Sequence, residues 1–443
     1  MKLWQKNKDV FAAVSAFTVG RDRELDLYLA SADVLGSLAH IRMLESIGLL
    51  TRDEWTALSA ELKVLYRDIE AGQFILDPEA EDIHSHIEIH LTRVLGDTGK
   101  KIHSGRSRND QVLVDIRLFL RDRLRELAGR TRQFFGLLIS LSEKYKDHLY
   151  PGYTHLQLAM PSSFGLWFGA YAESLVDDLI LLQGIYRIVN KNPLGSAAGY
   201  GSSFPLDRSL TTSLLGFDEL NYNVVYAQMG RGKTEKLVAQ GLAGISATLA
   251  RMAMDMCLYM NPGFGFVSFP DELTTGSSIM PHKKNPDVFE MIRAYGNRMQ
   301  ALPGEISLIT ANLPSGYHRD LQLLKEHLFP AFGNLTQCLD MATLMLEHIR
   351  IGEHILSDDR YKYLFSVEEV NRLVLEGMPF RDAYRKVGMD IEKGEFEPSR
   401  EIHHSHAGSM GNLCNEEISR MMDQVWNSFG FERSTEAIKK LTD

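Results

Sequence analysis

Residues 111–148 read QVLVDIRLFLRDRLRELAGRTRQFFGLLISLSEKYKDH, and no proline interrupts them. Apolar residues recur there at the spacing of one helix face, namely at Val112, Ile116, Phe119, Leu120, Leu124 and Leu127. A helix of that extent is roughly 55 Å long at 1.5 Å per residue. So long a surface needs partners along its whole length. The stretch therefore predicts a helical bundle, and it also predicts an oligomer.

The rest of the chain is also predicted to be mainly helical. Strand-like runs are short and few, such as Asn223 to Tyr226. We predict an all-α fold with an elongated central bundle and smaller helical domains at both ends. The predicted division is 1–105, 106–351 and 352–443. Further long helices are expected over Ser162 to Asn190, Thr234 to Asn261, Val288 to Leu302 and, approximately, Leu321 to Ile351.

Composition narrows the class of protein. The chain has 443 residues, 44% of them hydrophobic, which is enough for a large core. Its net charge is −10, and acids are interleaved with the basic residues of 121–132, so nucleic-acid binding is not expected. Polar residues interrupt the apolar stretch 238–260, so no membrane span is expected. The first ten residues lack the apolar core of a signal peptide, and the three cysteines form no pattern. We predict a cytoplasmic protein.

The segment GSSIMPHKKNP, residues 276–286, has the composition of an anion site that moves a proton. Asn285 before a proline predicts a helix start, with Asn285 as its N-cap. Backbone N–H groups at that helix end, with Lys283 or the next lysine, would stabilise a carboxylate close to Ser277 and Ser278. An ordinary capped basic loop has the same composition, and composition alone leaves both interpretations open.

Two further segments carry polar side chains in unusual density. In HSGRSRNDQ, residues 103–111, Ser107 and Asp110 fit a capping pattern, whereas Arg108 and Asn109 in the same turn suit a carboxylate ligand. PGYTHLQLAMP, residues 151–161, contains a single histidine, which is more often structural than catalytic on ordinary statistics.

Metal and nucleotide sites are not expected. His86 and His90 stand four residues apart, but no third ligand accompanies them, and the same holds for the histidines of 403–406. GRGKT at 230–234 matches the tail of a phosphate-binding loop, but its first glycine is replaced by Ala227.

The segment 276–286 resembles the signature GSSxMPxKxNP of the fumarase/aspartase superfamily of lyases, with every fixed position present. SGRSRNDQ and THLQ resemble the argininosuccinate lyase family in particular. Glu81, Asp82 and His84 also fall in an EDIH element similar to that family's EDxH.

The resemblance implies an elimination that forms fumarate. It implies Ser277 as the base, His155 as the acid, Lys283 as the group that activates the base, and Glu290 as the partner of the histidine. It implies no cofactor and a homotetramer in which each active site draws on three subunits. The substrate contacts that it implies are Arg108, Asn109 and Thr154 for the succinyl half, and Tyr317, Gln322 and Lys325 for the arginine half. Ser278 and Asn285 are further implied substrate contacts.

The chain departs from the family pattern on the arginine side. YHRDLQLLK carries His318 where asparagine is usual, and Leu323 and Leu324 where acids are usual; MGRGKTE, from Met229 to Glu235, replaces SDRD. The expected reaction is the cleavage of argininosuccinate in arginine biosynthesis. Two alternatives stay open, namely a lyase for another N-substituted aspartate and a non-catalytic relative similar to the lens crystallins.

Overall fold

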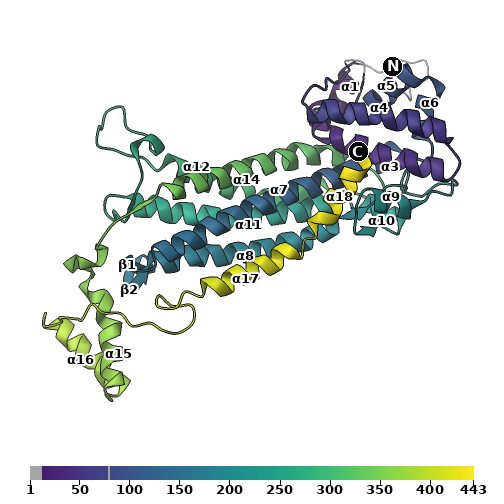
Figure 1. The fold of residues 1–443 in the computed structure, drawn as a ribbon. Helices are drawn as coiled ribbons and strands as arrows, with labels where there is room; N and C mark the ends of the chain where they lie inside the picture. Colours follow the sequence, from purple (N-terminus) through teal and green to yellow (C-terminus); the bar gives the residue numbers. More distant parts are fainter. Residues whose placement is uncertain (1–11, 78–79) are drawn as a thin grey trace.

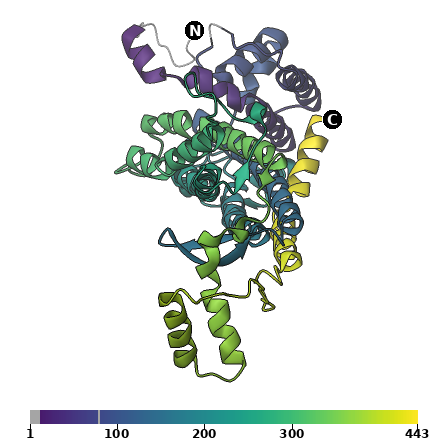
Figure 2. The ribbon, with the colours of Figure 1, turned by 90° about the vertical axis from the view of Figure 1, so that its left-hand side faces the viewer.

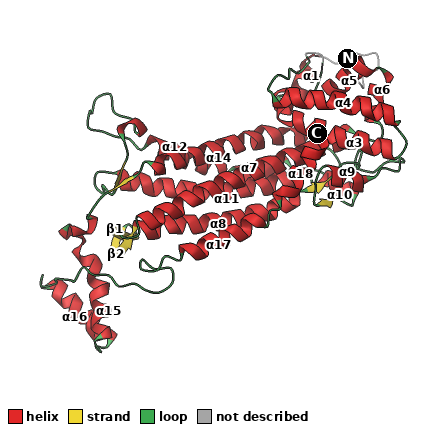
Figure 3. Cartoon of the chain, viewed as in Figure 1, coloured by secondary structure: helices red, strands yellow, loops and turns green. Residues whose placement is uncertain are grey.

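A computed structural model describes residues 12–77 and 80–443. The molecule is a long helical rod with a helical cap at one end and a small helical unit at the other (Figure 1). Helices make up almost all of the regular structure, as Figure 3 shows. The predicted all-α class is confirmed. Residues 1–11 and 78–79, and with them the ten residues that were considered for a signal peptide, lie outside the described residues.

Five long helices form the rod. They are α7 (Arg108–Lys144), α8 (Phe164–Val189), α11 (Lys233–Met260), α12 (Asp287–Met299) and α14 (Leu323–Glu347). α7 packs on α8 and α14, and α11 packs on α8, α12 and α14. Their apolar faces meet in one core in which Phe134, Phe164, Phe168 and Tyr186 are fully buried. Each such side chain contributes about 1.5–3 kcal/mol by leaving water.

α11 is the one helix of the described residues that is long and apolar enough to cross a membrane by length and composition. However, 61% of its most apolar window is buried inside the protein. α12 approaches α11 closely at Gly296, where a Cβ atom would lie 2.7 Å from the Ser246 carbonyl oxygen. α11 is therefore a core helix of the rod.

The cap has an apolar cluster of its own, and α3 also packs against α7. Its elements are α1 (Ala12–Val19), α2 (Asp22–Leu25), η1 (Asp26–Leu29), α3 (Ala30–Ser46), α4 (Arg52–Glu70), α5 (Ile83–Leu95), α6 (Asp97–Lys100) and η2 (Lys101–His103).

Shorter elements connect and flank the rod. α17 lies along α8 and α7, and α18 reaches back to α3, while α15 and α16 project away from the rod (Figure 2). The predicted domain boundaries remain predictions. The helical elements are α9 (Arg208–Leu214), α10 (Val224–Met229), η3 (Asp271–Leu273), α13 (Leu302–Ile309), η4 (Arg319–Gln322), η5 (Ile355–Ser357), η6 (Asp359–Phe365), α15 (Ser366–Leu375), α16 (Phe380–Glu392), α17 (Asn415–Asn427) and α18 (Phe431–Thr442).

Within 12–77 and 80–443, three small sheets interrupt the helices. β1 (Leu149–Thr154) and β2 (Gln157–Ser163) form an antiparallel hairpin. β3 (Lys191–Asn192) pairs in parallel with β4 (Glu219–Leu220), and β5 (Val267–Ser268) pairs antiparallel with β6 (Arg350–Ile351). The strand expected at Asn223 to Tyr226 is wrong: the Asn223 side chain accepts the Tyr226 N–H at 2.9 Å and starts α10 instead.

Candidate active site

A cavity of about 230 Å³ lies where the cap meets the rod. Five of the predicted substrate-binding residues line it, namely Arg108, Asn109, Tyr317, Gln322 and Lys325. They come from the start of α7 and from the segment around η4, about 200 residues apart in the chain. Charges of both signs surround them, because Asp22, Asp26, Glu81, Asp82 and Arg319 also line the cavity.

The start of α7 is fixed by capping. Ser107 is the N-cap and donates its backbone N–H to Asp110 at 2.8 Å, so the predicted capping pattern is confirmed. The other oxygen of Asp110 accepts the N–H groups of Gly195 and Ala197, both at 2.9 Å. Burial raises the pKa of Asp110 to about 6. One carboxylate thus joins the helix start to a glycine-rich loop.

Arg108 is held in place by the cap. Its guanidinium donates to Asp82 at 2.9 Å and to Ser85 at 2.7 Å. Asp82 also caps α5 by accepting the Ser85 N–H, so α5 and α7 begin at one shared cluster. An arginine fixed in this way has a defined orientation at the wall of the cavity.

Lys325 is almost fully buried and forms ion pairs with Asp26 at 2.6 Å and with Asp22 at 2.9 Å. Burial raises the pKa of Asp26. Nearby, the Gln322 side chain donates to the Tyr317 hydroxyl at 2.8 Å. Within the described residues, the buried Oε1 of Gln322 has no hydrogen-bond partner. Gln322 lines the cavity, and a free amide oxygen is an acceptor that suits an ammonium group.

A buried polar network adjoins the cavity, and its His84 is one of the residues that line it. Nδ1 of His84 lies 3.0 Å from Asp33 and 3.5 Å from Asp115, and Gln111 donates to Asp33 at 2.7 Å. Burial alone would lower the pKa of His84, but the charge and hydrogen bond of Asp33 raise it to about 9. Burial and the nearby Asp33 charge hold the pKa of Asp115 well above its usual range.

Asp33, His84 and Asp115 are also the one group of the described residues whose donor atoms, within 4.8 Å of one another, could hold a metal ion. His84 is hydrogen-bonded to Asp33, whereas both carboxylate oxygens of Asp115 are buried without a hydrogen-bond partner among the described residues. His86 instead accepts the Asp77 N–H, and His90 pairs with Glu61.

The serine loop, which is the segment 276–286, lies between β5 and α12, at the end of the rod away from the cap (Figure 1). The hydroxyl oxygen of Ser277 accepts the backbone N–H groups of Ile279 at 3.3 Å and Met280 at 3.1 Å. Donors aimed at this oxygen favour its deprotonated form. Ser278 and Lys283 are exposed.

The expected role of Asn285 as a helix cap is wrong. α12 starts at Asp287 with Pro286 in the N-cap position. The Asn285 side chain instead donates to Thr275 and Gly276 within the loop, both at 3.4 Å. These hydrogen bonds connect the two ends of the serine loop.

His155 is located at the tip of the β1–β2 hairpin, directly after Thr154. Thr154 pairs with Gln157, so His155 and Leu156 form a two-residue turn, with φ of 55° and 58°. Side chains other than glycine rarely adopt this conformation, and such strain is typical of functional positions. Glu290 is exposed in the first turn of α12.

The predicted residues thus form two groups at opposite ends of the rod (Figure 1). Arg108 and its neighbours lie at the cap, while the hairpin and the serine loop lie at the other end. The 37 residues of α7 span roughly 55 Å. A single chain therefore does not bring the two groups together.

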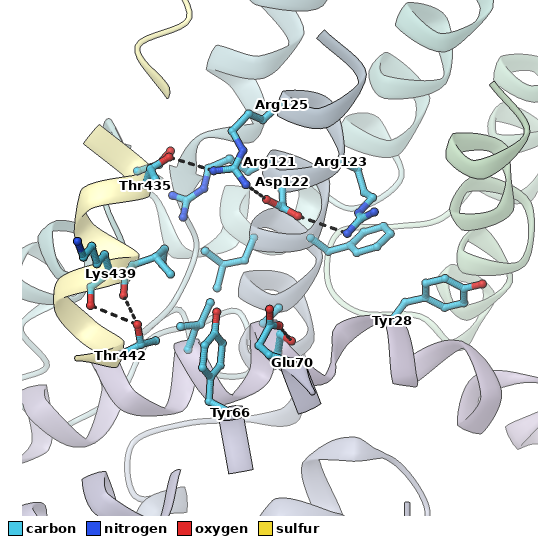
Figure 4. A pocket seen from close by; sticks show the side chains of 17 residues that line it. Tyr28, Tyr66, Glu70, Arg121, Asp122, Arg123, Arg125, Thr435, Lys439 and Thr442 are labelled. Carbon is cyan, nitrogen blue, oxygen red and sulfur yellow. Dashed lines mark hydrogen bonds and ion pairs between the residues drawn. The ribbon is translucent and has the colours of Figure 1, made fainter. Parts of the chain in front are cut away.

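A larger cavity, of about 530 Å³, is elsewhere, between α3, α4, α7 and α18 (Figure 4). Its charged groups largely satisfy each other. Asp122 pairs with Arg125 at 2.5 Å and with Arg123 at 3.4 Å, while Arg125 also donates to Thr435. None of the predicted site residues lines it.

Comparisons with known proteins identify the class to which the chain belongs. The family model described as Lyase matches residues 15–300, so the chain is a member of this class of lyases. Argininosuccinate lyases of Parabacteroides distasonis and Bacteroides thetaiotaomicron are 63% and 62% identical over 440 residues, covering 99% of each chain. One from Thermotoga neapolitana is 39% identical over 87% of this chain and 97% of its own. The chain belongs to the argininosuccinate lyase family.

Solved structures support the fold. EDDS lyase in complex with formate matches with a TM-score of 0.74 at 21% identity, covering 98% of this chain and 94% of its own. A class II fumarase from Schistosoma mansoni matches with a TM-score of 0.69 at 15% identity, covering 96% and 97%.

The acidic residues that form ion pairs with Lys325 at the cavity could not be predicted from the sequence. Asp22 and Asp26 lie some 300 residues from Lys325, and no local pattern connects them. The EDIH element did identify Asp82 and His84, but Asp33 and Asp115 carry no comparable signal.

Proposed function

We propose that this chain eliminates fumarate from argininosuccinate and releases arginine, the last step of arginine biosynthesis. The main support is the cavity, in which five residues matched from the family motifs line one space. Its mixed charges suit a substrate that has carboxylates, an ammonium group and a guanidinium group. The names of the full-length relatives favour this substrate over another N-substituted aspartate and over a structural role.

The elimination breaks one C–H and one C–N bond. Ser277 takes the proton beside a succinyl carboxylate, and its oxygen is prepared for this by two backbone N–H groups and the nearby Lys283. Charge then develops on the carboxylate as an enediolate, which needs fixed donors. His155, oriented by Glu290, protonates the guanidino nitrogen as the C–N bond breaks.

Binding is divided between the two groups of residues. Arg108, Asn109, Thr154, Ser278 and Asn285 hold the succinyl carboxylates. Tyr317, Gln322 and Lys325 contact the arginine half, with the unpaired Gln322 oxygen facing its ammonium group. The loop from Leu273 to Lys284 closes over the substrate and excludes water.

The active enzyme is a cytoplasmic homotetramer that needs no cofactor, no metal, no nucleic acid and no membrane. Its active sites lie between subunits, because the cavity and the serine loop are at opposite ends of one rod (Figure 1). In this assembly the ends of neighbouring antiparallel rods meet.

The test is the release of fumarate from argininosuccinate, followed by its ultraviolet absorbance. Turnover that disappears in Ser277→Ala supports the proposal. A folded tetramer that is inactive on argininosuccinate but active on another N-substituted aspartate contradicts it.

A further inference from the structure

A second cavity, of about 340 Å³, lies behind the segment that carries Tyr317 and Gln322. The turn between α10 and α11 forms one wall, and residues 307–321 contribute the other. Arg231, Lys233 and Lys236 line it together with His318. No carboxylate side chain is among the described residues that line this cavity. It is therefore a basic cavity in a chain whose net charge is −10.

Arg231 has an unused donor there. Its side chain is only 2% exposed. One terminal nitrogen, Nη2, donates to the Leu321 carbonyl oxygen at 2.9 Å, and Nε lies 3.5 Å from Glu235. The other terminal nitrogen, Nη1, is buried and has no hydrogen-bond partner among the described residues, and the same is true of Nε and of Glu235 Oε1. A buried guanidinium N–H without an acceptor is costly, so this nitrogen points to a ligand.

The backbone adds to the positive potential. The 28-residue helix α11 starts at Lys233 and directs the positive end of its dipole toward this turn. Gly232 precedes it with φ of 78°, and a Cβ atom there would lie 2.6 Å from Thr310 Cγ2. Glu235 accepts the Gly232 N–H at 2.7 Å but does not line the cavity.

We propose that this basic cavity binds a tetrahedral oxyanion of the phosphate class. Arg231 Nη1 supplies a fixed donor, Lys233 and Lys236 close over the anion from the first turn of α11, and His318 faces them from the opposite wall. The anion also stabilises the segment around η4, because Arg231 holds its Leu321 carbonyl. This inference goes beyond the proposed function and does not depend on it.

The test is calorimetric titration of the full-length chain with inorganic phosphate, at constant ionic strength maintained with chloride. We expect saturable binding of one phosphate per chain. Lys233→Ala/Lys236→Ala should weaken it by at least about tenfold, since two charge-assisted contacts are lost. A control variant, Lys393→Ala/Lys440→Ala, removes the same charge from exposed positions elsewhere and should bind as the wild type does.

Three results would overturn the inference. They are the absence of saturable binding, an equal loss in the control variant, and binding that survives in the Lys233/Lys236 variant but disappears in Arg108→Ala. The last result would assign the anion to the active-site cavity. Should the double variant fold poorly by circular dichroism, the milder Lys236→Gln serves in its place, with an expected weakening of several-fold.

Discussion

Two inactive variants should restore activity to each other when their subunits are mixed. Ser277→Ala damages the serine loop, and Arg108→Ala damages the cavity at the other end of the rod. Within one chain these groups are separated by the length of α7, roughly 55 Å. In the proposed tetramer each active site takes its loop and its cavity from different chains.

The expected recovery follows from random assembly. In an equal mixture, a given site receives an intact loop with a chance of one half and an intact cavity with a chance of one half. About a quarter of the sites are then fully intact, so the mixture should regain about a quarter of wild-type turnover. A site contained within one chain would regain nothing.

The assay needs co-expression of the two variants with different affinity tags, purification through both tags, and measurement of fumarate release. The control is a mixture of Ser277→Ala with Lys283→Ala, two changes in the same loop, which should not recover. Mixed tetramers, verified by native mass spectrometry, that show no more activity than their parents would refute the divided site.

Three further outcomes are expected. His155→Gln should reduce turnover by about 10²–10⁴-fold with the helical circular dichroism unchanged, because a general acid is lost; wild-type turnover would remove His155 from the mechanism. The raised pKa of His84 stabilises the fold fully below about pH 6.5, and this contribution of about 3 kcal/mol should be lost as pH rises to about 9. Urea unfolding at both pH values measures it, and His84→Asn should abolish the difference. Phe168→Ala should lower the free energy of unfolding by about 3–5 kcal/mol, since the ring is fully buried in the rod; a smaller loss in urea would mean that the core collapses around the space.

The long helices could be predicted because their apolar spacing is a local property. The helices expected over Ser162 to Asn190 and Thr234 to Asn261 agree with α8 and α11 to within two residues at each end. The Ser107 cap was predicted for the same reason. The hairpin at 149–163 was not predicted, because His155 and Leu156 are not residues that normally form such a turn.

Contacts between distant parts of the chain were harder to predict from the sequence than the helices were. Family motifs selected the residues that line the cavity, but local sequence gave no distance between them. The expected Asn285 cap was wrong because the side chain found partners ten residues earlier, at Thr275. Such competition between hydrogen-bond partners is decided by the folded loop and not by the local pattern.

The hairpin tip has a consequence for engineering. A thermostability screen would replace His155 and Leu156 by Asn-Gly, the pair that suits two successive positive φ values and relieves about 1–3 kcal/mol of backbone strain per residue. That exchange would remove the proposed proton donor. Leu156→Gly alone keeps the histidine. Stabilising substitutions near an active site often lower activity, but this one should raise the thermal stability and leave the proposed proton donor in place.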